Sequence, residues 1–200
     1  MQISKLDAAR RQLLAAIHLN WFLTEPIATY QLAANAAELC DSLLVSMDKF
    51  RMKEHIRQVT GWSEQDIVAL VNRPRNFTKH ANRDPDAVMD DITHEDCDAV
   101  ILTACLDYGI ASGRSPLPVG VFLAWHSAVY PSKPDSLFSG LAKKLFPNLQ
   151  QETREAQVRA ARQYVAGPVD SWLLNDSRNE LTDAWRWIDL RKHGQDFRTE

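Results

Sequence analysis

Hydrophobic residues recur at the three- and four-residue spacing of amphipathic helices along most of this chain. Ser4 can cap a first helix over residues 5–23, because Asp7 follows in the first turn and apolar residues then repeat along one face. Thr24 can cap a second helix over residues 25–44, which has a proline in its first turn. The short link between the two predicts an antiparallel helical hairpin.

Capping residues, glycines and prolines divide the rest of the chain into further helices. Pro74 is expected to end one of them, because proline lacks an amide hydrogen and clashes with the preceding helical turn. No stretch alternates between apolar and polar residues as a half-buried strand does, and the sequence has no internal repeat. The predicted fold class is therefore all-α, a helical bundle with additional C-terminal helices. The further predicted helices cover residues 50–61, 63–74, 93–113, 119–130, 135–146, 150–166 and 177–194.

A glycine and two prolines within residues 113–118 mark the best candidate for a domain boundary. We expect residues 1–112 to form an N-terminal bundle and residues 113–200 to form a C-terminal helical extension packed on it, unless both belong to one continuous domain. The second helix is rich in alanine. Small side chains of this kind allow a neighbouring helix, or a second copy of the chain, to approach closely.

The composition permits a sizeable hydrophobic core and offers no general attraction to nucleic acid. The chain has 200 residues, of which 45% are hydrophobic, and a net charge of -3 with a pI near 6.1. RNA could therefore be bound only by a local patch of cations, although a solvated charged face is the commoner use of such residues. The cations available for a patch are Arg51, Lys53, Arg57, Arg73, Arg75, Lys79 and Arg83.

The cysteines and the N-terminal residues bear on the cellular setting. Cys40, Cys97 and Cys105 lie in apolar helical segments and form no CxxC pair, so buried and reduced thiols are the expected state. The first residues lack the apolar region of a secretion signal, and no apolar run reaches the length that spans a membrane. We therefore expect a cytoplasmic protein that does not interact with membranes.

Residues 75–80, with the sequence RNFTKH, carry the residue types best suited to catalysis. Arg75 can hold a phosphate with its planar guanidinium, and His80 can transfer a proton near neutral pH. His80 could take the proton of a ribose 2′-hydroxyl or return one to the leaving 5′-oxygen, while Asn76 orients either partner. Because one imidazole cannot easily be both acid and base in one turnover, two copies facing each other would suit this chemistry better.

On a helical scaffold, the arrangement of Arg75, Asn76 and His80 as Arg-Asn-x-x-x-His resembles the HEPN superfamily, which includes metal-independent ribonucleases of toxin–antitoxin and antiphage systems. The resemblance implies a helical homodimer in which paired Arg and His residues meet in a cleft. It also implies RNA as the substrate, an antitoxin or another protein as a partner, and no metal or cofactor. Residues 5–40 and 76–87 are in addition similar to a group of uncharacterised bacterial proteins.

Two other uses of this region are open. His80 could hydrogen-bond across its own turn while Arg75 pairs with Asp84 or Asp90, and the chain would then be a non-enzymatic helical interaction protein that forms homodimers. The acidic stretch could instead bind a metal ion, but its spacing matches no calcium loop, and helix starts favour acidic residues in any case. The side chains available for such a metal site are His80, Asp84, Asp86, Asp90, Asp91, His94, Glu95 and Asp96.

Overall fold

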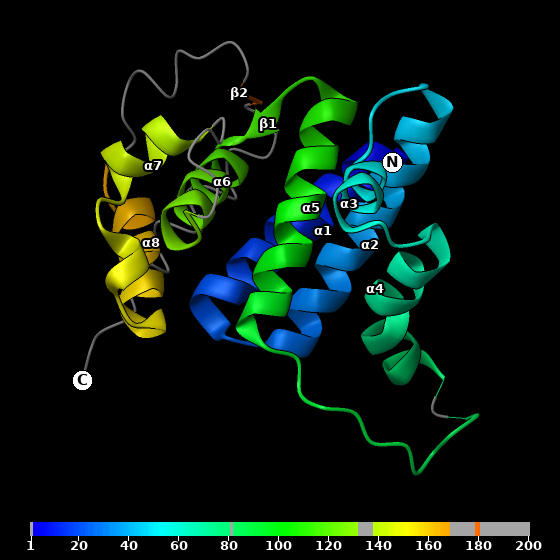
Figure 1. Cartoon of the computed structure of the whole chain (residues 1–200). Helices are drawn as coiled ribbons and strands as arrows, with labels where there is room; N and C mark the ends of the chain where they lie inside the picture. The colour runs from blue at the N-terminus through cyan, green and yellow to red at the C-terminus, as the bar shows by residue number, and fades with distance from the viewer. Residues whose placement is uncertain (1, 81, 132–137, 169–178, 181–200) are drawn as a thin grey trace. The chain divides into compact units, whose positions relative to one another are not determined.

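The computed structural model describes residues 2–80, 82–131, 138–168 and 179–180, and nearly all of the secondary structure in them is helical (Figure 1). The predicted all-α fold class is confirmed. A single pair of two-residue strands, β1 (Ser115–Pro116) and β2 (Asn179–Glu180), runs parallel in this part of the chain. The α-helices are α1 (Lys5–His18), α2 (Pro26–Ser46), α3 (Met52–Thr60), α4 (Glu64–Lys79), α5 (His94–Ser112), α6 (Leu117–Val129), α7 (Ser139–Leu145) and α8 (Arg154–Ala166).

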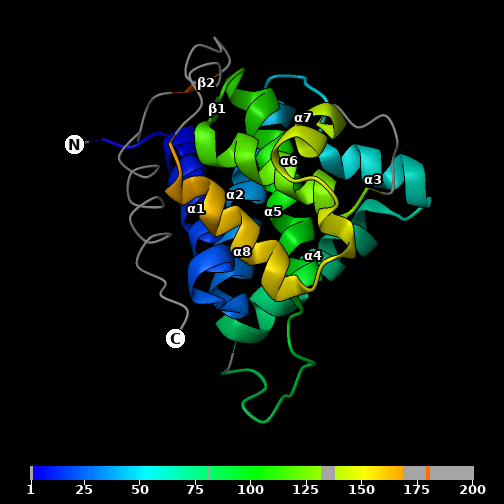
Figure 2. The ribbon, with the colours of Figure 1, turned by 90° about the vertical axis from the view of Figure 1, so that its left-hand side faces the viewer.

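The chain divides into two compact units, of which the first comprises Met1–Asn20 and Glu25–Gly113. Within this unit α2 packs against both α1 and α5, while α4 packs on α2 and α3 (Figure 2). Ala33, Ala34, Ala36 and Ala37 of α2 are buried in this packing and are therefore not available as a surface for a second copy of the chain. The buried alanines and cysteines of the three central helices are Ala9, Ala16, Ala33, Ala34, Ala36, Ala37, Cys40, Cys97, Ala104, Cys105 and Ala111.

Three of the predicted helix starts have the expected caps. The side chains of Ser4 and Thr93 each accept a hydrogen bond from the backbone amide three residues later. In both cases the aspartate at that later position, Asp7 or Asp96, accepts a hydrogen bond from the backbone amide of the cap residue. Ser63 accepts in the same way from the amide of Asp66, at 3.1 Å. Gly113 has a φ of 72° and ends α5, a left-handed conformation that glycine adopts without strain.

The link between α1 and α2 differs from the prediction. Helix α1 ends at His18 and continues as a π-helical turn over Leu19–Leu23, and Thr24 has a φ of 51° and does not cap α2. Glu25 occupies the cap position without a side-chain hydrogen bond. A residue of this π-helical turn makes a tertiary contact, because the Asn20 side-chain amide donates a hydrogen bond to the buried Asp98 carboxylate at 2.8 Å.

The second unit comprises Trp21–Thr24 and Arg114–Glu200. Its core contains Trp21, Phe122 and Trp125, whose ring centroids lie 5.6–5.8 Å apart. The Trp125 indole donates to the carbonyl of Gln157 at 2.8 Å, which ties α6 to α8. The carbonyl of Trp21 accepts a hydrogen bond from Arg162.

Helix boundaries in the second unit shift by several residues from those predicted. A 3₁₀ turn over Leu149–Gln151 precedes α8, and Thr153 caps α8, so the single helix predicted over 150–166 is wrong at its start. Helix α7 begins at Ser139, and residues 135–137 of the predicted helix lie outside the described residues. Residues 179–180 form β2 because their backbone pairs with β1, and the rest of the helix predicted over 177–194 lies outside the described part.

A buried carboxylate attaches α3 to the first unit. Asp107 of α5 is 1% exposed, and its Oδ1 accepts a hydrogen bond from the backbone amide of Met52 at 2.8 Å. Arg51, the residue at the cap position of α3, makes no side-chain cap, so Asp107 supplies the cap from another helix. Burial raises the pKa of Asp107 to about 6, although the hydrogen bond from Met52 opposes the shift.

The raised pKa of Asp107 predicts how stability depends on pH. The folded protein holds this proton up to about pH 6 while the unfolded chain loses it near pH 4, so the contribution of Asp107 to stability falls as the pH rises through this window. Asp107→Asn keeps an oxygen for the Met52 amide and removes the buried charge. We expect the unfolding free energy to rise by about 1–3 kcal/mol at pH 7.5 and to stay unchanged near pH 4.

Urea unfolding at the two pH values measures this difference. Asp86→Asn, which removes an exposed carboxylate of the same unit, is the control for the change in net charge. A loss of stability in Asp107→Asn at pH 7.5 would contradict the prediction. It would show that the hydrogen bond from Met52 to a charged carboxylate stabilises the fold by more than the burial of that charge destabilises it.

Candidate functional site

Helix α4 carries the predicted site and does not end at Pro74. It begins at Glu64, directly after its cap Ser63, and continues through the proline to Lys79. Proline cannot donate to the carbonyl one turn earlier, but α2 supplies hydrogen bonds around this position. The Tyr30 hydroxyl donates to the Val71 carbonyl at 3.1 Å, and the Gln31 amide donates to the Pro74 carbonyl at 3.3 Å. The prediction of a helix end at Pro74 is therefore wrong, because contacts with α2 hold the helix together across it.

Tyr30 is suited to this role because it stays protonated. Burial raises the pKa of its phenol to about 12, with a smaller contribution from the nearby Asp96 carboxylate. The hydroxyl therefore remains a hydrogen-bond donor throughout the physiological pH range.

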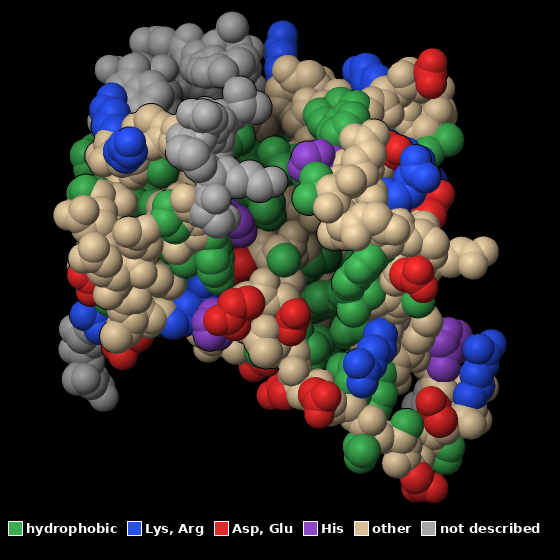
Figure 3. Space-filling view, viewed as in Figure 1, with side chains coloured by type: hydrophobic (Ala, Val, Ile, Leu, Met, Phe, Trp, Pro, Cys, Tyr) green, Lys and Arg blue, Asp and Glu red, His purple; other side chains and the backbone are tan. Residues whose placement is uncertain are grey.

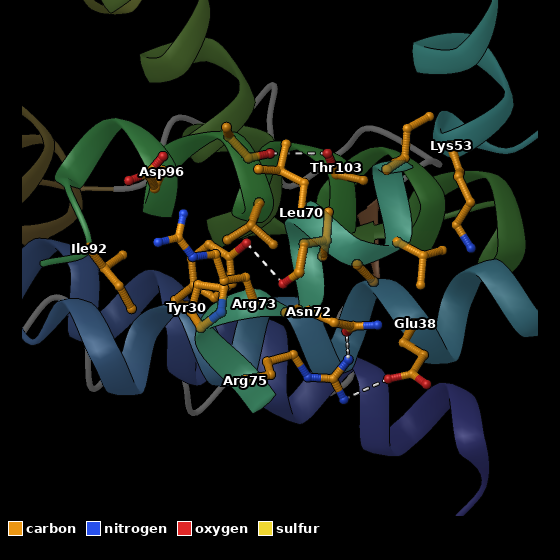
Figure 4. A pocket seen from close by; sticks show the side chains of 18 of the residues that line it. Tyr30, Glu38, Lys53, Leu70, Asn72, Arg73, Arg75, Ile92, Asp96 and Thr103 are labelled. Atoms are coloured by element: carbon orange, nitrogen blue, oxygen red, sulfur yellow. Dashed lines mark hydrogen bonds and ion pairs between the residues drawn. The ribbon is translucent and has the colours of Figure 1, made fainter. Parts of the chain in front are cut away.

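Arg75 lies in the contact between α4 and α2. The residue is 8% exposed, and its Nη2 lies 2.6 Å from Oε2 of Glu38 on α2, while its Nη1 donates to Asn72 at 2.7 Å (Figure 4). Its Nε is buried and has no hydrogen-bond partner among the described residues. Arg75 thus pairs with an acidic residue, as the alternative interpretation expected, but the partner is Glu38 of α2 and not Asp84 or Asp90.

Asn76 and His80 lie at the C-terminal end of α4, where Asn76 is exposed and His80 is half-buried. His80 is the residue at which the helix ends, and its backbone amide donates to the Asn76 carbonyl at 3.0 Å. Neither side chain has a hydrogen-bond partner within the part of the chain that the structure describes. His80 follows Asn76 by four positions, which is about one helical turn.

Arg75 and His80 do not share a face. They are five positions apart, which is a rotation of about 140° around the helix axis. Arg75 points toward α2, where its guanidinium contacts Glu38, whereas Asn76 and His80 lie four positions apart at the end of α4. A phosphate could reach Arg75 only if Glu38 released the guanidinium.

The cations of this region fall into two groups. Those of the α3 segment pair with acids: Arg51 and Lys53 contact Asp41 at 3.1 and 2.6 Å, and Arg57 contacts Glu54 at 2.7 Å. Around the end of α4, by contrast, exposed cations have no carboxylate partner among the described residues, and Figure 3 shows Lys or Arg and His side chains at the surface there. These cations are Lys79 and Arg83, whereas Arg73, which is also exposed, lines the groove beside α4.

A groove of about 580 Å³ lies beside α4 in the same unit, lined by α2, α4, α5 and the segment that leads into α5 (Figure 4). Its lining includes Leu70, which is 54% exposed, as well as Glu38 and Arg75. The sequence analysis missed this groove. The available signal was that apolar residues occupy positions 67, 68, 70 and 71, which cover more of the α4 circumference than one contact with α2 needs.

Two carboxylates of the acidic stretch at the start of α5 stabilise the local backbone. Asp96 completes the capping box with Thr93, and Asp91 accepts from the Ile92 amide at 2.8 Å. No group of three or more His, Cys, Asp or Glu side chains in the described residues is arranged to hold a metal ion.

Comparison with protein-family models, with curated proteins and with solved structures gives no match for this chain. Among the described residues, no helix is both long and apolar enough to cross a membrane.

The ion pair between Arg75 and Glu38 predicts an asymmetric effect of removing its two partners. Glu38→Gln leaves the Arg75 charge in a site that is 8% exposed, whereas Arg75→Met leaves the Glu38 carboxylate, whose side chain is 61% exposed, in contact with water. We expect Glu38→Gln to lower the unfolding free energy by about 1–3 kcal/mol and Arg75→Met to lower it by less.

Urea unfolding at pH 7 compares the two variants. Glu155→Gln, which breaks the exposed pair with Arg159 on α8, should cause no measurable change and controls for the loss of a surface ion pair. A larger loss in Arg75→Met than in Glu38→Gln would mean that Arg75 stabilises the unit by packing and not through its charge.

Proposed function

We propose that this chain is an HEPN-like RNA-binding protein that cleaves RNA without a metal ion, with its site at the C-terminal end of α4. The observation that supports this proposal best is the pair Asn76 and His80, one helical turn apart, reachable from solvent and without side-chain partners in the described residues. Lys79 and Arg83 are exposed, have no carboxylate partner among the described residues and lie close to His80 in the sequence, so a phosphate backbone finds positive charge there despite the net charge of -3.

His80 carries the proton transfers in this proposal. The imidazole takes the proton of a ribose 2′-hydroxyl, whose oxygen then attacks the adjacent phosphorus and displaces the 5′-oxygen of the next nucleotide. The products are a 2′,3′-cyclic phosphate and a free 5′-hydroxyl, and the leaving oxygen needs a proton from an acid. A second copy of the chain could supply that acid as its own protonated His80, so the proposal includes a homodimer.

The remaining residues divide the supporting tasks. Asn76 lies one turn before His80 and can orient the 2′-hydroxyl or a phosphate oxygen, while Lys79 and Arg83 can hold the phosphates. Arg75, in its observed contact with Glu38, is a positioning residue that fixes α4 on α2. The direct phosphate contact that the HEPN resemblance implies for Arg75 needs the release of Glu38.

Cleavage of RNA in the presence of EDTA tests this proposal. We expect wild-type protein to cleave single-stranded RNA and His80→Ala to lose about 10²–10⁴-fold in rate, because a general acid–base contributes by this factor. His94→Ala replaces another exposed histidine of the same unit and should leave the rate unchanged. Circular dichroism shows whether the variants are folded. Absence of cleavage by folded wild-type protein on RNAs of varied sequence would favour the non-enzymatic interaction protein.

The salt dependence of RNA binding tests the cation cluster separately from cleavage. Each phosphate contact contributes about 0.7 to the slope of log K against log salt for a single strand, so Lys79→Gln with Arg83→Gln should reduce this slope by about 1.4. Fluorescence anisotropy with a labelled single-stranded RNA between low and moderate salt measures it.

The matched control is the double variant Lys5→Gln with Arg11→Gln, which removes two exposed cations of α1 and the same net charge. An equal change of slope in both double variants would place RNA binding elsewhere on the protein.

A further inference from the structure

The groove of the first unit lies between two helices that do not close over it. Helices α4 and α5 both pack on α2, but α4 makes its other main contact with α3 and not with α5. The wall formed by α5 extends from Asp96 to Asp107, about three helical turns or 16 Å. The opposite wall is α4, from Ile67 to Arg75, and the floor is α2. The groove is thus elongated along the helices and has the length of a short helical segment.

The middle of the groove is apolar and partly exposed to water. Leu70 is 54% exposed and Val68 is 36% exposed, and both line the groove, where Figure 4 shows Leu70 beside Thr103 of α5. Figure 3 shows hydrophobic side chains between α4 and α5 with acidic side chains beside them. Side chains of this kind are stabilised when an apolar partner removes them from water.

Charge at the groove favours a cationic partner. The lining cations Lys53 and Arg75 are already engaged, the first by Asp41 at 2.6 Å and the second by Glu38 at 2.6 Å. At the other end Asp90, Asp91 and Asp96 line the groove without a cationic partner among the described residues, and Arg73 is the lining cation there. The uncompensated charge at this end is negative, which attracts Lys or Arg and repels an anion.

We infer that this groove binds an amphipathic, positively charged α-helix of a partner protein, which inserts its apolar face between α4 and α5 and places Lys or Arg beside Asp90, Asp91 and Asp96. Apolar side chains spaced at i, i+3, i+4 and i+7 on such a helix would meet Leu70 and Val68 along the groove. The inference rests on the shape and charge of the groove alone, so it stands or falls independently of the proposed RNA cleavage.

A designed peptide serves as the probe. It has about 14 residues of Leu, Ala and Lys, with Leu at helical spacing on one face and Lys on the other, and carries a rhodamine label for fluorescence anisotropy. We expect saturable binding with a dissociation constant on the order of micromolar at about 0.15 M salt. A scrambled peptide of equal composition, and a peptide with Glu in place of Lys, should bind at least about ten-fold more weakly.

Two pairs of variants locate the binding. Leu70→Gln should weaken the Lys peptide by about ten-fold or more, whereas Val59→Gln, at a 63% exposed position of α3 outside the groove lining, should not. Asp90→Asn with Asp91→Asn should weaken binding mainly at low salt, and Asp84→Asn with Asp86→Asn in the same segment is the matched charge control.

Four outcomes would overturn the inference. The first is that no saturable binding occurs up to about millimolar peptide, a concentration at which even a weak site fills. The second is that the scrambled or the Glu peptide binds as tightly as the Lys peptide. The third is unchanged affinity of the Leu70→Gln variant, and the fourth is an equal loss of affinity in the two aspartate double variants. Sedimentation equilibrium adds a further one, since a wild-type dimer that Leu70→Gln dissociates would identify a second copy of this chain as the occupant.

Discussion

The attachment of α4 to α2 is the constraint on which the first unit depends. Two side chains of α2 donate hydrogen bonds to carbonyls of α4 near Pro74, and a third pairs with the guanidinium of Arg75. Without these contacts a proline in the middle of a helix would favour a break. Because α4 continues to Lys79, it places Asn76 and His80 at its exposed end and Leu70 at the wall of the groove. Both candidate sites are therefore consequences of one interface.

The two sites differ in charge although they lie along the same helix. Within the described residues, Lys79 at the end of α4 and Arg83 just after it have no carboxylate partner, whereas Asp90, Asp91 and Asp96 of the groove have no cationic partner. A phosphate backbone and a basic helix would therefore be directed to different surfaces by electrostatics alone.

The features of the fold that could be predicted from the sequence are those that depend on residues close together along the chain. The caps Ser4, Ser63 and Thr93 each bond to an amide three residues away, and a residue pattern records such a contact directly. The continuation of α4 through Pro74 could not be predicted, because the hydrogen bonds that support it come from residues 41 and 43 positions away. The same holds for the partner of Arg75 and for the groove, which exists only because α4 stands apart from α5.

Helix α3 contributes no buried side chain to the unit, and besides its packing on α4 and α5 it is attached by the cap from Asp107 and the ion pairs of Arg51 and Lys53 with Asp41. A segment held by polar contacts opens locally at a lower free energy than the global unfolding that would separate α2 from α5. Its backbone amides should therefore exchange with solvent ahead of those in the central helices. Since Lys53 and Ile56 line one end of the groove, such an opening would lengthen the groove without disturbing the core. An opening of this kind would make the length of the groove adjustable, and ligands of different length would meet different energetic costs there.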